Sequence, residues 1–350
     1  MLKQPAVPLE LYLGIDWGKK FSQVFAFDRQ GVVVIRQKIE TLDAGAWRAL
    51  LAPLRERFSI QAAFEAGAHY DWLYDLLKEF CAEVAVIDPA QFAVISKSQR
   101  KTDKIDAQKI AEGVRRGDLP RVHVPDACTR ADRRLVAFAH FMGQQKARLK
   151  NKLRGLFLTL RLECPASDIG GAKALKWYRE KVQLTLDPLS RMQADVLYAQ
   201  LELIQKQREE IDLAVQARAQ SYAQAEILDS IPGLGKLGIL AILSAIAGIE
   251  RFQRPEQLSS YFGVCGSVFQ SGNTLIQGAL TKRGNVHVRW LLSQALQHLH
   301  RKDPRARKRF LKLRRKKPCG VARGAQVRWL TKIIWHVLTK NEMYRIGDAA

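Results

Sequence analysis

The sequence predicts a mixed α/β domain followed by a mainly helical remainder, and three observations predict this fold class. The first hundred residues alternate short β-rich runs with helical stretches. From about residue 127 to residue 225 the strand signal disappears and helical periodicity replaces it. After residue 226, turns rich in glycine and proline separate further helices. We therefore expect an α/β domain over 8–126, a helical, coiled-coil-like region over 127–225 and a mainly α domain over 226–350.

The N-terminal part predicts three strands that form an antiparallel meander, because only the short turns KK and RQG separate them. Helices and strands then alternate, and the order βββαβαβα describes a mixed sheet with helices packed on it. The expected strands span 11–18, 21–28, 32–40, 61–66 and 82–89, and the expected helical segments span 46–58, 70–80 and 90–117.

The middle of the chain predicts two long helices, over roughly 130–162 and 188–225, with a loop at 164–171. The second helix carries an apolar stripe whose spacing alternates between three and four residues. Periodicity alone leaves two interpretations open, a helical hairpin within one chain and a coiled coil between chains. The stripe comprises Ala194, Leu197, Leu201, Ile204, Arg208, Ile211, Val215, Arg218 and Tyr222.

The C-terminal part predicts a turn that leads into an apolar helix at 229–246. A glycine-punctuated loop follows within 260–296 and leads into another helix, and the final helix spans 325–340. The segment 301–317 between the last two helices has eleven lysines and arginines and one acid. A solvated tail is one interpretation. The apolar residues Phe310, Leu311 and Leu313 favour a partly ordered phosphate-binding element, in which Arg314, Arg315, Lys316 and Lys317 contact nucleic acid.

The charge of the chain indicates a polyanionic partner. Lysine and arginine number 57 against 34 acids, which gives a formal net charge of +23. Such an excess is most often found in proteins that bind nucleic acid. No apolar run reaches the length of a membrane span, and the N-terminus lacks the pattern of a secretory signal. The five scattered cysteines suit a reducing compartment, so we expect a cytoplasmic protein with no membrane partner.

Four carboxylates are the strongest candidates for a metal site. Asp16 and Glu65 each interrupt an apolar strand, where an unpaired charge is costly. Asp103 and Asp106 are three residues apart, so they share one face of a helix. The first and fourth strands of such a sheet are commonly neighbours, and the helix can pack beside them. Neighbouring lysines offer an ordinary explanation for the helical pair, but four converging carboxylates favour Mg²⁺, with Mn²⁺ as an alternative.

The motifs GIDWGKKF, FEAG and TDKIDAQKIA resemble the Asp, Glu, Asp-x-x-Asp signature of the DEDD-type transposases of the insertion sequence 110 family. The segments IPGLGKLGILAILSAI and YFGVCGSVFQSGNTLIQGALTKRGNVHVRWLL resemble the C-terminal transposase domain of that family. Together these motifs cover nearly the whole chain apart from its helical middle. The resemblance implies an N-terminal RuvC-like domain of the RNase H-like fold. Gly266 stands near a position where the family often has proline, which leaves the conformation of that loop open.

The resemblance also implies a serine nucleophile in the Ser-Gly pair, which is Ser271 in this sequence, with Ser267 as the nearest rival. From the residues alone, a Ser-Gly turn in a hairpin is the simpler interpretation. A serine needs activation to act as a nucleophile. Lys282, Arg283 and Arg289 follow in the chain and can stabilise charge on the phosphate in the transition state.

The sequence and the resemblance together predict a transposase or site-specific recombinase that cuts and rejoins DNA through a phosphoserine intermediate. The resemblance further implies a structured guide RNA, encoded by the element, that pairs with donor and target DNA. Recombining two duplexes requires several active sites, so we expect a dimer or tetramer. Two alternatives remain, a structure-selective DNA endonuclease that does not rejoin its products and a non-catalytic nucleic-acid-binding protein.

Overall fold

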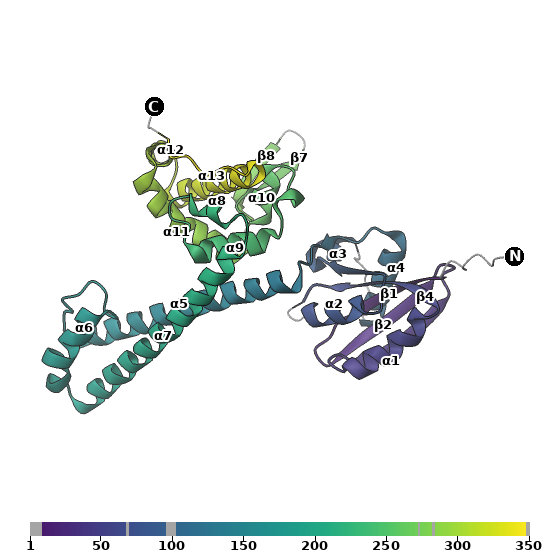
Figure 1. The fold of residues 1–350 in the computed structure, drawn as a ribbon, viewed down its shortest axis with the longest axis horizontal. Coiled ribbons are helices and arrows are strands. Elements are labelled where there is room, and N and C mark those ends of the chain that lie inside the picture. The colour runs from purple at the N-terminus through teal and green to yellow at the C-terminus, as the bar shows by residue number, and fades with distance from the viewer. Residues whose placement is uncertain (1–8, 68–69, 96–102, 272–273, 282–283, 348–350) are drawn as a thin grey trace. The chain divides into compact units, whose positions relative to one another are not determined.

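The structure is a computed structural model that describes residues 9–67, 70–95, 103–271, 274–281 and 284–347. It divides into two compact units, Met1–Val124 (unit 1) and Pro125–Ala350 (unit 2). Figure 1 shows both units and labels most of their helices and strands. Within the described part of the chain, no helix is both long and apolar enough to cross a membrane.

Unit 1 is a six-stranded mixed sheet with helices on both faces, in the strand order β3-β2-β1-β4-β5-β6. β1 pairs antiparallel with β2, and β2 with β3, so the predicted meander is confirmed. β1 also pairs parallel with β4, as the sequence predicted for the first and fourth strands. The elements are β1 (Leu9–Asp16), β2 (Phe21–Asp28), β3 (Val33–Glu40), α1 (Ala44–Arg55), β4 (Phe58–Glu65), α2 (Tyr70–Lys78), β5 (Glu83–Ile87), α3 (Pro89–Ile95), α4 (Asp103–Arg116) and β6 (Arg121–Val122).

The helical segment predicted over 90–117 comprises two helices, α3 and α4, and residues 96–102 between them lie outside the described part. The two-residue strand β6 was not predicted, because a pair of residues carries no periodic pattern. β6 pairs antiparallel with β5 and extends the sheet by one strand.

The two faces of the sheet have separate cores because alternate residues of a strand point to opposite faces. On one face, the buried Leu11, Leu13 and Ile15 of β1 pack with Trp47 of α1 and Leu73 of α2. The other face packs against α4, where Tyr12 of β1 and Ala63 of β4 join Ile110 and Val114 of the helix in a second core.

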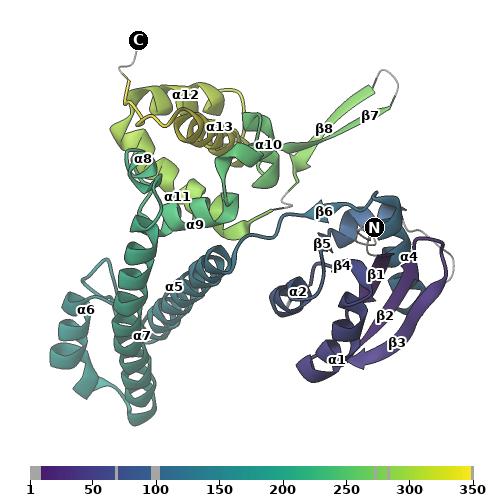
Figure 2. The ribbon, with the colours of Figure 1, turned by 45° about the vertical axis from the view of Figure 1, so that its right-hand side comes forward.

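Unit 2 consists of helices and one two-stranded sheet, which Figure 2 shows as a long hairpin. Its two longest helices are α5 and α7, with 33 residues each. The elements are α5 (Ala127–Thr159), α6 (Ala172–Trp177), η1 (Tyr178–Val182), η2 (Gln183–Thr185), α7 (Pro188–Gln220), α8 (Ala225–Asp229), α9 (Lys236–Ile246), η3 (Ile249–Arg251), α10 (Pro255–Tyr261), β7 (Gly266–Ser271), β8 (Thr274–Leu280), α11 (Val286–Lys302), α12 (Pro304–Arg314) and α13 (Cys319–Lys340).

The apolar stripe on α7 packs within the chain. α5 and α7 run side by side in Figures 1 and 2 and contact each other along their length. Leu201 is 1% exposed and joins a core with Leu153 and Phe157 of α5. The guanidinium of Arg208, which interrupts the stripe, donates to the Ala139 carbonyl of α5 at 2.5 Å. The structure therefore has the helical hairpin within one chain, which is one of the two interpretations that periodicity left open.

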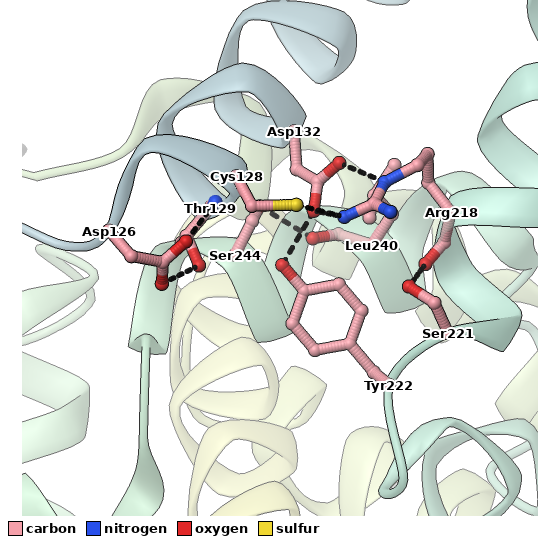
Figure 3. A network of polar contacts seen from close by, with 9 residues as sticks. All are labelled: Asp126, Cys128, Thr129, Asp132, Arg218, Ser221, Tyr222, Leu240 and Ser244. Atoms are coloured by element: carbon pink, nitrogen blue, oxygen red, sulfur yellow. Dashed lines mark hydrogen bonds and ion pairs between the residues drawn. The ribbon is translucent and has the colours of Figure 1, made fainter.

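A buried carboxylate joins the start of α5 to the end of α7. Figure 3 shows Asp132, which is 2% exposed, between Arg218 and Tyr222. The Arg218 guanidinium donates to both carboxylate oxygens, at 2.7 and 2.9 Å, and the Tyr222 hydroxyl donates at 2.7 Å. The hydrogen bond to Asp132 raises the pKa of Arg218, and burial followed by the bond to Asp132 raises the pKa of Tyr222. Both polar residues at the end of the stripe thus fix the register of the hairpin.

The predicted glycine-punctuated loop contains the β7–β8 hairpin, so its assignment as a loop is wrong. The hairpin forms because β-branched and aromatic residues flank Gly272 and Asn273, a pair that favours two-residue turns. α13 also begins at Cys319, six residues before the predicted start, with Pro318 at its N-cap. Proline is well suited to a helix start because it has no backbone N–H to leave unpaired.

Candidate active site

Two of the four predicted acids end neighbouring parallel strands. Ile15 of β1 pairs with Phe64 of β4, so the next step in the same register brings Asp16 beside Glu65. Adjacent strands lie about 4.8 Å apart. Both acids are half-buried and point to the same face of the sheet, the face that packs on α4. The sheet therefore holds these two carboxylates side by side at one edge.

Helix α4 lies directly on β1 at Gly14. A Cβ atom at Gly14 would lie 2.2 Å from the Ala107 carbonyl oxygen and 2.3 Å from the Ala111 nitrogen, so only glycine allows this approach. Tyr12, which precedes Gly14 on β1, is close enough to Arg115 near the end of α4 for the positive charge of Arg115 to act on its hydroxyl group. The helix thus runs opposite to β1, and its first turn lies toward the edge where β1 ends.

The first turn of α4 carries the other two acids. Asp103 begins the helix, and Asp106 lies one turn before Ile110, which is buried against the sheet. Positions four apart lie above one another on a helix, so Asp106 is on the sheet side of α4, at the same edge as Asp16 and Glu65, and Asp103 belongs to the same first turn. The positive end of the helix dipole stabilises carboxylates in this turn by about 0.3–1 kcal/mol.

The side chains themselves are not gathered into a metal site. Among the side chains that the structure describes, no group of three His, Cys, Asp or Glu residues is able to hold a metal ion. Asp106 forms an ion pair with Lys109 at 3.8 Å, one of the ordinary partners that the sequence suggested. Asp16 and Glu65 also have interaction partners. The side chain of Asp103 lies outside the described part. The structure thus brings together the strand and helix ends that carry the four acids.

Ser271 is the last residue of β7, where its backbone pairs with Thr274 of β8. Gly272 and Asn273, between the two strands, lie outside the described part, as does the side chain of Ser271. The rival Ser267 lies near the other end of the same strand. The nucleophile suggested by the family resemblance therefore ends one strand of a β-hairpin, which agrees with the simple interpretation that the Ser-Gly pair belongs to a hairpin.

Of the three cations expected to support Ser271, only Arg289 is described, since Lys282 and Arg283 lie outside the described part of the chain. Arg289 is in the first turns of α11, and its guanidinium donates to the Phe262 carbonyl at 3.2 Å. Asn285 caps α11 by accepting from the backbone N–H groups of His287 and Val288. The start of α11 is thus held in place, and Arg289 binds the backbone of Phe262 in addition to the phosphate contact that the sequence predicts for it.

The basic segment 301–317 is ordered and helical for most of its length, so a purely solvated tail is excluded. Asp303, which is fully buried, caps α12 by accepting from the N–H groups of Arg305 and Ala306, and the Tyr344 hydroxyl donates to it as well. Phe310 stacks on His300 of α11 at 4.7 Å between ring centroids. The four cations at the end of the segment, Arg314, Arg315, Lys316 and Lys317, are exposed.

The sequence did not reveal a cluster of cations that come from α12, from α13 and from the turn between them. A pocket of about 730 Å³ lies between β7, β8, α12 and α13, and we name it the α13 pocket. Arg309, Lys317, Arg328, Lys332 and Trp329 are among its lining residues. The sequence did contain a signal, because one face of this helix has a glycine or a cation at every fourth position. The residues are Gly320, Gly324, Arg328 and Lys332, so the face has no side chains at its start and cationic side chains toward its middle.

Comparisons with known proteins match both units. A family model described as a transposase, of the DEDD type of IS110 elements, matches residues 13–161, which include all four acids. A second, described as the IS116/IS110/IS902 family of transposases, matches residues 225–311, which include Ser271, Lys282, Arg283 and Arg289.

Two relatives match the chain over almost its whole length. The transposase for insertion sequence element IS1111A of Coxiella burnetii is 25% identical, over 96% of this chain and 91% of that protein. A protein of Pseudomonas aeruginosa named "Probable family 20 transposase" is 24% identical, over 96% of this chain and 98% of its own length. The similarity therefore includes the helical region between the two matched domains.

Proposed function

The chain belongs to the IS110 family of transposases, and from this membership we propose that it is a site-specific recombinase that cuts and rejoins the DNA of a mobile element. The observation that carries the proposal is the register of β1 with β4, which sets Asp16 beside Glu65, together with the first turn of α4 at the same edge. If these acids only stabilised the fold, there would be no need for half-buried carboxylates from β1, β4 and α4 to lie at the same edge of the sheet.

We propose that Asp16, Glu65, Asp103 and Asp106 hold Mg²⁺, or alternatively Mn²⁺, in an RNase H-like, RuvC-like domain. The donors fit such an ion, because hard divalent cations prefer carboxylate oxygens. When bound, the ion would stabilise charge on the oxygens of the phosphate that reacts. The acids position that ion, and the pairing of Asp106 with Lys109 is a contact that metal binding would replace.

In the proposed reaction, the Ser271 hydroxyl attacks a DNA phosphate. The bond from the serine oxygen to phosphorus forms as the bond from phosphorus to one deoxyribose oxygen breaks. The serine proton leaves, and the departing oxygen becomes a hydroxyl. A hydroxyl of a second strand later attacks the phosphoserine, which restores the serine and rejoins DNA. The number of phosphodiester bonds is conserved, so no ATP is consumed. Lys282, Arg283 and Arg289 are proposed to bind the phosphate.

The partners of the proposed reaction are donor DNA, target DNA and further copies of the chain. A structured guide RNA is proposed from the family resemblance, and the net charge of +23 is compatible with it. All five cysteines are free, as suits the reducing cytoplasm in which we propose the protein acts. A dimer or tetramer is proposed because two duplexes must be cut together.

The test is a denaturing gel of the full chain mixed with labelled DNA carrying the ends of its element, with the element RNA and magnesium. We expect a labelled band that migrates with the protein and disappears when Ser271 is changed to alanine. Cut DNA without a protein-linked band would favour the endonuclease. Intact DNA under conditions where the protein binds it would favour a non-catalytic binding protein.

A further inference from the structure

The α13 pocket has the chemical character of a nucleic-acid site outside the proposed catalytic groups. Arg309, Lys317, Arg328 and Lys332 line it, and no acid is among the lining residues. Lys332 forms an ion pair with Glu256 of α10, which lowers the pKa of that carboxyl group. Among the described residues, no ion pair involves Arg309, Lys317 or Arg328. Glu256 also lies within reach of the charge of Arg328. Four exposed or half-buried cations from α12, the following turn and α13 thus converge around a single nearby acid, which leaves an excess of positive charge that attracts an anion.

The pocket also offers a flat, preformed surface. The Arg309 guanidinium lies over the Trp329 ring at 5.7 Å from its centroid. Such a cation–π contact holds the planar guanidinium in a fixed orientation. Arginine planes and aromatic rings are the surfaces on which proteins stack nucleobases. The pocket thus combines a stacking surface with cations for the phosphate groups.

The size of the pocket indicates a single strand. A volume of about 730 Å³ is within the range of roughly 300–1,000 Å³ for pockets that enclose small molecules. One or two nucleotides of a single strand fit such a volume, whereas a duplex does not enter it. Gly320 has no heavy atom within 4 Å of its Cβ position, so the wall of the pocket at the start of α13 is low. A strand can therefore approach the helix backbone there.

The pocket lies along the strand that carries Ser271. Gly266, the first residue of β7, lines it, and Ser271 ends the same strand. At about 3.3 Å per residue, the two backbone positions are about 16 Å apart. A DNA strand attached to Ser271 and laid along β7 therefore reaches the pocket with nucleotides close to the cut.

We infer that the α13 pocket binds one or two unpaired nucleotides of the DNA strand that reacts with Ser271, with the phosphates on Arg309, Lys317 and Arg328 and a base stacked on the Arg309–Trp329 pair. The inference rests on the proposed function, because that function supplies the DNA strand at β7. It adds a selectivity for single-stranded DNA that the basic surface as a whole does not provide.

The test compares two triple variants of the full chain, each with three cations changed to glutamine. The pocket variant is R309Q/K317Q/R328Q. The control is R314Q/R315Q/K316Q, which removes the same charge from neighbouring exposed positions outside the pocket lining. Binding of a short single-stranded DNA, and separately of the same sequence as a duplex, is measured by fluorescence anisotropy over a series of salt concentrations in EDTA.

For single strands, log K falls with log salt with a slope of about −0.7 per phosphate neutralised. We expect the pocket variant to flatten the single-strand slope by about 2 while leaving the duplex slope near that of wild type. The control variant should flatten both slopes. An unchanged single-strand slope in the pocket variant, or equal losses for single strand and duplex, would overturn the inference. A loss seen with single-stranded RNA and not with DNA would also overturn it.

A second measurement locates the contact directly and protects the test against misfolded variants. Wild-type protein is photo-crosslinked to single-stranded DNA that contains 5-iodouridine, and the modified peptide is identified by mass spectrometry. We expect the crosslink on the peptide that contains Trp329. A crosslink elsewhere would overturn the inference. The proposed function fails separately, if no covalent adduct forms on Ser271 even though the pocket binds the single strand.

Discussion

The acids in unit 1 and the serine in unit 2 are held by very different scaffolds. Asp16 and Glu65 end central strands of a six-stranded sheet, each with neighbours on both sides and a helix on its face. Ser271 ends one strand of a two-stranded hairpin, which has no further strand to support it. Isolated hairpins are only marginally stable, so such a hairpin depends on what it packs against. The backbone that carries Asp16 and Glu65, which we call the acid edge, is thus held by strands on both sides, whereas the strand that ends at Ser271 has one strand beside it.

The largest effect should come from the acids. Changing Asp16, Asp103 or Asp106 to asparagine, or Glu65 to glutamine, should reduce recombination by at least about 10³-fold, the scale of loss when a catalytic group is removed. Affinity for nucleic acid and the melting temperature should stay close to wild type. Strand exchange, DNA binding and thermal unfolding are measured on the same preparations.

Glu40→Gln is the matched control for the acid edge. Glu40 ends β3 at the same edge of the sheet, two strands away from Asp16, and it is exposed. Its variant should recombine normally. If three of the four acid variants recombine as well as Glu40→Gln does, the acids do not form a catalytic site. The comparison between the sheet that carries the acids and the hairpin that carries Ser271 would then have no bearing on the reaction.

A second effect concerns stability and should be confined to unit 2. Leu201→Ala should lower the free energy of unfolding by about 2–5 kcal/mol, because Leu201 is buried against α5 and its truncation leaves a cavity. Leu213→Ala on the same helix should change it by less than about 0.5 kcal/mol, since Leu213 is 69% exposed. Urea unfolding measures both. Equal effects would mean that the α5–α7 hairpin does not form as described.

The smallest effect is a pH dependence of unit 2. Burial, followed by the neighbouring His140, lowers the pKa of His287 in the folded state. Below the unfolded value of about 6.5, the unfolded state then binds more protons, so the free energy of unfolding should fall as the pH drops through this value. Burial also lowers the pKa of His300, which should add to the same loss of stability at low pH.

His287→Gln should reduce this loss of stability between neutral and mildly acidic pH, as measured by urea unfolding at several pH values. His336→Gln, at an exposed position on α13, serves as the control and should keep the wild-type dependence. A His287 variant that loses as much stability in acid as the control would show that the half-buried imidazole of His287 does not cause the pH dependence.

The edge of the sheet that carries Asp16 and Glu65 was predictable from the sequence, because strand periodicity and short turns are features of neighbouring residues. Short turns fixed the meander, and the neighbouring positions of the first and fourth strands placed Asp16 near Glu65. Nothing in the pattern revealed the close approach of α4 at Gly14, since that contact joins residues almost a hundred positions apart. The family resemblance, and no periodic signal, supplied the role of Ser271.

Other features were missed or left open for different physical reasons. An apolar spacing of three and four residues is the same for a helix that packs on its own chain and for one that packs on another chain. The sequence therefore did not decide which partner the stripe on α7 packs against. The β7–β8 hairpin had a usable signal in its Gly-Asn pair, but the surrounding glycines favoured a loop. The α13 pocket draws its cations from separate elements, which only tertiary structure brings together.

The most direct test of the central claim is to locate the covalent bond. The adduct is trapped with labelled DNA, digested with nuclease and analysed by mass spectrometry for the residue that carries the nucleotide. We expect a nucleotide on Ser271, no adduct in the Ser271→Ala variant and a normal adduct in Ser221→Ala, which removes an exposed hydroxyl at the end of α7. A nucleotide on Ser267, on a tyrosine or on no residue would contradict it.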